Sequence, residues 1–139
     1  MKKKNKLHRC STPGCGNKNR PGNKFCYSCL TRKYRQAHPD RYAYMTLRDN
    51  AKRRKKPFSI SFEYFKQFCY ETGYLVGKGR TKNSFSVDRI IEHIGYVEGN
   101  LQVLPVGKNK KKHLEYDWQT RSARVVSGER PVPSGDDYF

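Results

Sequence analysis

The sequence predicts a small α+β fold in which an N-terminal four-cysteine zinc knuckle and basic helices precede a module of two strands and one helix (ββα). Three observations carry this prediction. Four cysteines form two close pairs near the start of the chain, Lys and Arg crowd its first 60 residues, and a Gly-punctuated stretch reads as strand, turn, strand and polar helix. With 35% hydrophobic residues, this chain of 139 residues can build only a thin core, so we expect metal to add stability.

The positive charge is concentrated in the N-terminal half. Residues 1–60 contain 18 Lys and Arg against two acidic residues, whereas residues 61–139 contain twelve against ten. A basic arm beside a nearly neutral module indicates a nucleic-acid partner, because Lys and Arg displace counterions from phosphates; the alternative is a merely solvated basic surface. No apolar run follows the first lysines, so we expect neither a signal peptide nor a membrane partner. We expect a cytoplasmic location.

The cysteine spacing predicts a structural zinc site over residues 10–30, after a basic tail at 1–9. Cys10, Cys15, Cys26 and Cys29 form the pattern C-x4-C-x10-C-x2-C. Two thiolate pairs closed by tight turns suit tetrahedral Zn²⁺, and four thiolates leave no open coordination position for catalysis. Disulfides and free thiols are the alternatives, the first disfavoured in a reducing compartment. We expect His8 to belong to the basic tail, with a role as substitute ligand as the alternative.

Residues 31–56 form the predicted basic helical segment. Pro39 divides it into two helices, the second beginning near Asp40. Tyr34, Tyr42 and Tyr44 alternate with arginines, which suits contact with nucleic-acid backbones and bases unless the rings pack against the next module. The candidate nucleic-acid contacts of this segment are Arg48, Lys52, Arg53, Arg54, Lys55 and Lys56.

The next module is expected over residues 57–120. Pro57 starts an extended stretch, and Ser61 is the predicted N-cap of a short helix that ends near Tyr70. The helix has the spacing of a buried face at Phe62, Phe65, Phe68 and Cys69, so we expect Cys69 to fill the core rather than act as a nucleophile. After residue 120 the chain becomes rich in Ser, Gly and Pro, which predicts a flexible tail over 121–139.

The stretch 86–113 carries the residues with the clearest chemistry. We expect a strand that ends at Asp88-Arg89, a turn, a second strand from Asn100, and a polar helix carrying Asn109 and His113. The i, i+4 spacing puts Asn109 and His113 on one helix face. Together with Asp88 they could converge on one divalent ion, and such oxygen-rich ligands favour Mg²⁺ or Mn²⁺.

Residues 42–114 resemble HNH nucleases of the ββα-metal family, in the compact form common in bacteriophages. The resemblance rests on Gly95-Tyr96-Val97-x-Gly99-Asn100-Leu101-Gln102-Val103-Leu104, followed by Asn109-x-x-Lys112 and preceded by Pro57-Phe58-Ser59-Ile60 and Asp88. It implies an HNH-like endonuclease that hydrolyses phosphodiester bonds in DNA by nicking. A phage-encoded protein would act in the cytoplasm of a bacterial host. The zinc knuckle is similar to modules that several HNH proteins carry.

The resemblance also implies roles for single residues. Asp88 and Asn109 would hold the catalytic metal with His113 as a third ligand, and Asn100 would tie the loop between the strands to the backbone. Three lysines of the final helix would face phosphates, or else form a solvated charge run: Lys110, Lys111 and Lys112.

One position departs from the family pattern. The general-base His that follows the Asp in the family is Arg89 here, and a guanidinium does not accept a proton at neutral pH. Either His93 swings in as the base, unless it is a solvent-facing turn residue, or metal-bound water suffices while Arg89 stabilises charge on the phosphate.

Three functions therefore stay open. The first is a metal-dependent DNA endonuclease, the second a non-catalytic zinc-containing DNA- or RNA-binding protein on a degenerate HNH scaffold, and the third a binder of structured RNA or the ribosome. We expect the first, with duplex DNA as partner and structured RNA as the alternative, because the set of Asp, Asn, Asn and His is more than a bare scaffold requires. The oligomeric state is left open.

Overall fold

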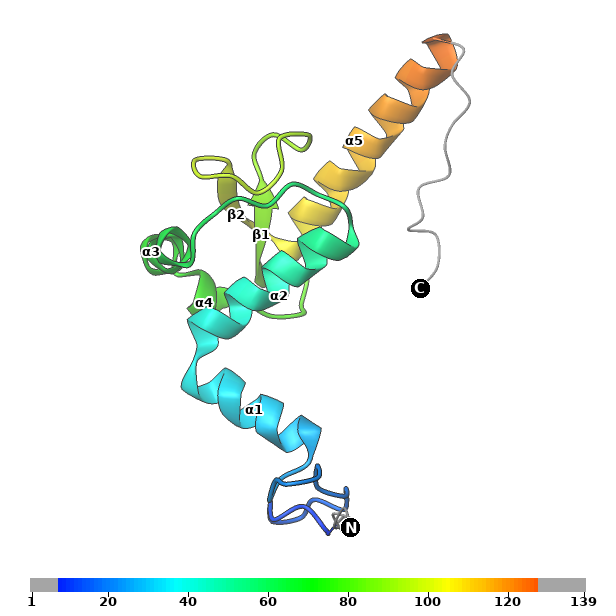
Figure 1. Ribbon diagram of the computed structural model, residues 1–139. Helices are drawn as coiled ribbons and strands as arrows, with labels where there is room; N and C mark the ends of the chain where they lie inside the picture. Colours follow the sequence, from blue (N-terminus) through cyan, green and yellow to red (C-terminus); the bar gives the residue numbers. More distant parts are fainter. Residues whose placement is uncertain (1–7, 128–139) are drawn as a thin grey trace. The chain divides into compact units, whose positions relative to one another are not determined.

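The computed structural model describes residues 8–127, with side chains described through residue 120. Its elements follow in the order α1 (Tyr27–Ala37), α2 (Pro39–Arg53), α3 (Phe62–Thr72), α4 (Tyr74–Gly77), β1 (Phe85–Arg89), β2 (Leu101–Pro105) and α5 (Val106–Ser127) (Figure 1). A two-stranded sheet, helices and a four-cysteine cluster near the N-terminus make this a small α+β protein, as the sequence predicted. The chain divides into two compact units, Met1–Ala43 and Tyr44–Phe139.

The first unit contains the cysteine loops and α1. Arg9 and Lys18 form an isolated antiparallel bridge, and Gly14 and Gly22 turn the chain with φ of 74° and 76°, values that favour glycine. Helix α1 begins at Tyr27, inside the second cysteine pair, so the basic helical segment starts earlier than residue 31. It ends before Pro39, which is the first residue of α2, so the predicted division of the two helices is confirmed.

Aromatic rings form the core of the second unit. The Tyr44 ring on α2 lies 5.6 Å from that of Phe58, 5.5 Å from that of Phe62 and 5.7 Å from that of Phe65, centroid to centroid. The Tyr44 hydroxyl donates to the carbonyl of Ile60 at 2.9 Å. Of the two roles that the sequence left open for Tyr44, the structure therefore shows packing within the core, which joins α2 to α3 through the extended residues between them.

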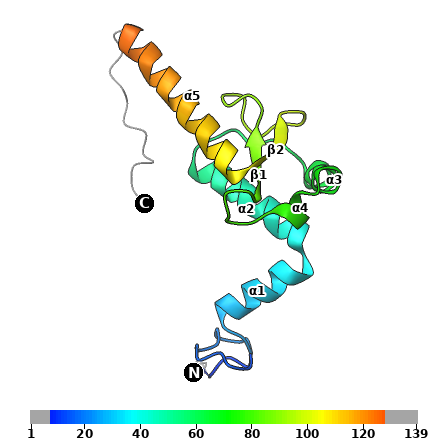
Figure 2. The same ribbon diagram turned by 180° about the vertical axis from the view of Figure 1, so that it is seen from behind.

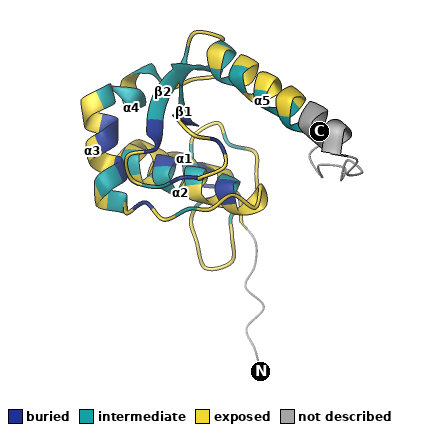
Figure 3. Cartoon of the chain, turned by 90° about the horizontal axis from the view of Figure 1, so that it is seen from above, coloured by how far each residue is buried: buried dark blue, intermediate teal, exposed yellow. Residues whose placement is uncertain are grey.

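Helix α3 begins where the sequence indicates and ends at Thr72, two residues beyond the expected Tyr70. Ser61 is its N-cap, and its Oγ accepts a hydrogen bond from the backbone N–H of Tyr64 at 3.1 Å. The helix ends at Gly73 in the left-handed conformation, φ 65°. Phe65, Phe68 and Cys69 are buried, so Cys69 lies in the core as expected. Figure 3 shows buried and exposed residues alternating along α3.

The stretch 86–113 contains the strand pair and the start of α5. Strands β1 and β2 pair antiparallel in a register that sets Asp88 opposite Gln102, and α5 follows β2 directly and contacts both strands. Helix α5 extends well past the two strands (Figure 2). It continues to Ser127, so the predicted start of a flexible tail at residue 121 is wrong; no Gly or Pro interrupts 108–127. The rest of that tail lies outside the described residues.

No helix in the described part of the chain is long and apolar enough to cross a membrane.

Candidate functional site

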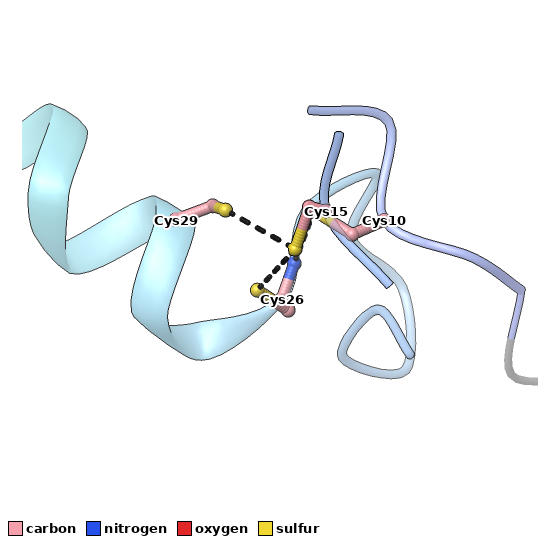
Figure 4. A group of neighbouring side chains, drawn as sticks. All are labelled: Cys10, Cys15, Cys26 and Cys29. Carbon is pink, nitrogen blue, oxygen red and sulfur yellow. Dashed lines mark hydrogen bonds between the residues drawn. The ribbon is translucent and has the colours of Figure 1, made fainter. Parts of the chain in front are cut away.

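The four cysteines of the first unit are positioned to hold one metal ion. The Sγ atoms of Cys10, Cys15, Cys26 and Cys29 all lie within 4.8 Å of one another (Figure 4). Cys15 Sγ lies 3.8 Å from Cys26 Sγ and 3.7 Å from Cys29 Sγ. A tetrahedral zinc ion with Zn–S bonds of about 2.3 Å has S···S edges of about 3.8 Å. These separations fit a shared zinc ion and are far too long for disulfides.

Backbone and side-chain donors surround the thiols unevenly. Hydrogen bonding to Thr12, and next the backbone N–H of Cys26, lower the pKa of Cys10 to about 6. The backbone N–H of Asn17 acts to lower the pKa of Cys15, but hydrogen bonds with the neighbouring thiols, together with burial, raise it to about 11. The Cys10 thiol thus loses its proton readily, whereas the Cys15 thiol retains its proton. A bound divalent cation would displace that proton.

Asp88, the carboxylate expected to bind the catalytic metal, is 4% exposed and already has two partners. Gln102 Nε2 donates to Asp88 Oδ2 at 2.7 Å from the directly opposite position of β2. Lys112 Nζ on α5 donates to the same oxygen at 2.8 Å. Sequence reasoning assigned no role to Gln102; the signal that could have found it is the antiparallel register, which pairs it with Asp88.

Lys112 differs from the expectation of a phosphate-facing lysine. Its ammonium donates to the backbone carbonyls of Arg89 and, at 3.2 Å, Ile90, as well as to Asp88. It also lies 3.9 Å from Glu92 Oε1. Lys112 turns inward because the buried Asp88 carboxylate and two backbone carbonyls accept hydrogen bonds from its ammonium in place of water. Lys111, by contrast, is 80% exposed and 3.9 Å from Glu115.

Arg89, at the position of the missing general base, is held inside the protein. Its guanidinium forms a hydrogen-bonded ion pair with Glu92, and both side chains are only 6% exposed. The guanidinium carbon lies 5.1 Å from the centre of the Tyr96 ring. Among the described side chains, Arg89 Nη1 is a buried donor that has no partner. Sequence reasoning did not foresee that Glu92 fixes this arginine.

A cavity of about 230 Å³ brings most of the predicted catalytic set together. Asp88, Arg89, Asn109 and His113 all line it. Asn109 Nδ2 donates to Ser86 Oγ at 3.0 Å and to the carbonyl of Val87 at 3.4 Å. These four residues therefore share one concave site between β1 and the first turns of α5.

Cations accompany this site. Arg54 and Lys110 also line the cavity. An adjoining hollow of about 440 Å³ shares Arg54 and Asn109 with it and is lined by Lys78 and Arg80, with no acidic residue in its lining. Of the candidate nucleic-acid contacts, Arg54 and Lys110 thus lie at the site.

The other basic residues of α2 and the turn after it do not line either hollow. Arg48 is paired with Asp49 at 3.3 Å, and Arg53 donates to Asn50 at 3.2 Å. The remaining three are exposed: Lys52, Lys55 and Lys56.

His93 does not join this cavity. It is exposed and lines a different hollow, beside Ile90, Ile91 and α5 residues such as Tyr116. The alternative in which His93 acts as the general base therefore has no support in the arrangement of the site. His113 does line the cavity, about half exposed, with Nε2 3.7 Å from Asp117 Oδ2.

Asn100 braces the loop between the strands. Its Nδ2 donates to the carbonyls of Ile91 at 3.0 Å and Gly95 at 2.7 Å, and its Oδ1 accepts from the backbone N–H of Ile91 at 2.9 Å. Gly95 is needed there: its φ is 89°, and a Cβ would lie 2.6 Å from the carbonyl oxygen of Pro57. This is the bracing role that the family resemblance implies for Asn100.

The predicted ligands of the catalytic metal, Asp88, Asn109 and His113, carry ligand atoms of types that a hard divalent ion accepts. Asp88 offers a carboxylate and Asn109 an amide oxygen whose nitrogen is already engaged, while His113 offers an imidazole. One Asp88 oxygen is already engaged by Gln102 and Lys112. Among the described residues, the four cysteines are the one group of three or more Cys, His, Asp or Glu close enough to share an ion.

Comparison of the chain with protein-family models, with curated proteins and with solved structures gave no match.

Proposed function

We propose that the protein binds nucleic acid and hydrolyses phosphodiester bonds in DNA with a divalent metal ion, through an HNH-like ββα module made of β1, β2 and α5. The observation that carries this proposal is the shared cavity of Asp88, Asn109 and His113. These side chains come from a strand and a helix more than 20 residues apart in sequence, which a merely structural role for each would not require.

Phosphate binding is the part of this function with the most direct basis in charge. Arg54 and Lys110 line the cavity, and Arg80 lines the adjoining hollow, where no acidic residue opposes it. A nucleic-acid backbone that followed these hollows would bring a phosphate next to Asp88 while its neighbours met arginine and lysine.

Asp88, Asn109 and His113 would hold the metal ion, Mg²⁺ or Mn²⁺. Such an ion, when bound, polarises a phosphoryl oxygen and lowers the pKa of a bound water. Arg89 does not serve as a base; its fixed guanidinium would stabilise negative charge on the phosphate, and its unpartnered Nη1 is a donor available for that purpose after a small shift. Loss of a positioned base typically costs about 10²–10⁴ in rate, so we expect a slow nuclease.

The first unit would supply affinity. A zinc ion in the four-cysteine site would be structural, because its ligand set is complete. Tyr27, 66% exposed, and Tyr34, 38% exposed, accompany the cations of α1. Arg20 lies over the Tyr27 ring, with its guanidinium carbon 5.6 Å from the ring centre. Exposed rings among cations suit stacking and backbone contact with nucleic acid.

A nicking assay on supercoiled plasmid tests the proposal. Zinc-loaded wild type would be compared with Asp88→Asn, Asn109→Ala and the exposed control Gln119→Ala on α5, with Mg²⁺ or Mn²⁺ at roughly 10 mM or with no added divalent ion. Nicking should require the added ion, vanish in the first two variants and persist in the control. Omitting the ion, rather than adding a chelator, leaves the zinc in place.

The second candidate is a non-catalytic zinc-containing protein that binds DNA or RNA on a degenerate HNH scaffold. The observation in its favour is that Arg89 is paired with Glu92 and Lys112 with Asp88, which are the contacts of a stable but inactive core. A folded wild type that binds duplex DNA but does not nick it at either metal would support this candidate. Tighter binding of hairpin RNA than of duplex DNA at equal salt would identify structured RNA as the partner.

A further inference from the structure

Lys112 lies in a cradle of oxygen atoms. Its ammonium donates to Asp88 Oδ2 at 2.8 Å, to the carbonyl of Ile90 at 3.2 Å and to the carbonyl of Arg89, and Glu92 Oε1 lies 3.9 Å away. Two carboxylates and two backbone carbonyls are the ligand types that a hard cation prefers. In this protein a lysine of α5 occupies that cradle.

The charges of the surrounding network balance without any added ion. Asp88 and Glu92 are 3% and 6% exposed at their side chains, and their two cationic partners are Lys112 and Arg89. A buried carboxylate that loses its partner is strongly destabilised. Lys112 is thus the counter-ion that allows Asp88 to be buried in ionised form.

A divalent ion at Asp88 would meet this ammonium. Like charges at a separation of about 4 Å repel appreciably at any dielectric found in a protein. Lys112 has a way out, because its side chain is 30% exposed and carries four rotatable bonds, whereas Asp88 is on a paired strand and cannot follow.

We propose that the Lys112 ammonium is the resident cation of Asp88, and that it competes with a divalent metal ion for this carboxylate. Metal binds there only when Lys112 leaves the cradle. The inference rests on the proposed function for one step alone, the choice of Asp88 as the metal-binding carboxylate. It makes Lys112 a positioning residue that sets the affinity of the site for metal.

Direct measurement of Mn²⁺ binding to the zinc-loaded full-length chain tests this, with no nucleic acid present. The free Mn²⁺ signal in electron paramagnetic resonance would be followed for wild type, Lys112→Met and Lys111→Met. Methionine keeps the length of lysine without its charge, and Lys111, 80% exposed, is the matched control. We expect Lys112→Met to bind one Mn²⁺ about tenfold or more tightly than wild type, and Lys111→Met to match wild type.

Two further measurements locate the effect. Adding Asp88→Asn to Lys112→Met should abolish the gained affinity. The melting temperature of Lys112→Met should fall without Mn²⁺ and recover with it, because the ion replaces the lost counter-ion. Should the methionine variant fail to fold, Lys112→Gln, which retains a donor but no charge, is read in the same way.

Equal Mn²⁺ affinity in wild type and in the folded Lys112 variants would overturn the inference. So would saturation of wild type by Mn²⁺ while Lys112 stays as protected from acetylation, read by mass spectrometry, as it is without metal. Neither readout involves cleavage. A protein that shows the competition but never nicks DNA would therefore refute the proposed nuclease alone, and a nuclease without the competition would refute this inference alone.

Discussion

Gln102 and Asp88 face each other across the β1–β2 pair, and Gln102 Nε2 donates to Asp88 Oδ2 at 2.7 Å. The Gln102 amide carries no charge of its own, but it orients one oxygen of the Asp88 carboxylate. Lys112 contacts the same oxygen. The orientation of the candidate metal ligand is therefore set from the sheet as well as from the helix.

Replacing Gln102 should loosen this carboxylate. Gln102→Met removes a hydrogen bond to a charged group, so we expect the free energy of unfolding to fall by about 1.5–3 kcal/mol. Urea denaturation of zinc-loaded protein measures it. Gln119→Met, at an exposed position of α5, is the control and should stay within about 0.5 kcal/mol of wild type.

The Arg89–Glu92 pair should matter far more than the Arg48–Asp49 pair. Both join an arginine to a nearby carboxylate, but the side chains are 6% exposed in the first pair and 50% and 66% exposed in the second. Arg89→Met should cost about 3–5 kcal/mol by leaving Glu92 buried and unpaired, and Arg48→Met at most about 1 kcal/mol.

A double substitution separates pairing from packing at Arg89. Adding Glu92→Met to Arg89→Met should restore part of the lost free energy of unfolding, because no buried charge then lacks a partner. If the double variant is less stable than the single one by the full cost of a second core substitution, the interpretation as an ion pair fails.

Removing the Asn100 amide should free the loop between the strands. Asn100→Ala breaks three hydrogen bonds, to the N–H and carbonyl of Ile91 and the carbonyl of Gly95, at an expected cost of about 2–3 kcal/mol. Hydrogen exchange of the Ile91 amide should accelerate with it. Asn83→Ala, at an exposed position before β1, provides the comparison and should leave that amide protected.

Zinc retention should depend on Thr12. Its hydrogen bond is the largest of the influences that lower the pKa of Cys10 to about 6. A lowered thiol pKa favours the thiolate, so protons compete less with the metal for Cys10 as the pH falls. Thr12→Val raises this pKa and should shift acid release of zinc, followed with a chromogenic chelator, to higher pH. Ser11→Ala, exposed and adjacent, should leave the release profile unchanged.

Replacing Arg54 should lower both the affinity for DNA and the nicking rate. Arg54→Ala should lower the slope of log K against log salt for duplex DNA by about 0.9, the contribution of one phosphate contact. Because Arg54 lines the cavity of Asp88, the nicking rate at saturating protein should fall as well. Arg53→Ala removes an exposed cation that lines neither hollow, so any loss there should be confined to affinity.

The parts of this protein that follow local rules were predictable. The cysteine spacing anticipates the sulfur cluster, Pro39 and Ser61 mark helix starts, and Gly punctuation separates β1 from β2. Each depends on backbone conformation within a few residues. The end of α5 was missed because residues 121–127 were grouped with the Ser-, Gly- and Pro-rich stretch that follows them.

The partners of the site residues were harder to predict because they depend on register and on helix rotation. Lys110, Lys111 and Lys112 are consecutive in sequence, yet one lines the cavity, one points to solvent and one turns onto Asp88. Only the rotation of α5 against β1 separates them. In the same way, Arg89 became a buried partner of Glu92 through the local conformation of three residues after the strand.

The four-cysteine cluster has a consequence for the electrostatic character of the whole chain. Four thiolates and one Zn²⁺ carry a combined charge of −2, so loading lowers the formal net charge from +18 to +16. The added negative charge falls at the start of α1, where Cys26 is the N-cap and the helix presents its positive end. Zinc-loaded and zinc-free protein should therefore separate on a cation exchanger, which makes metal content readable from an elution profile.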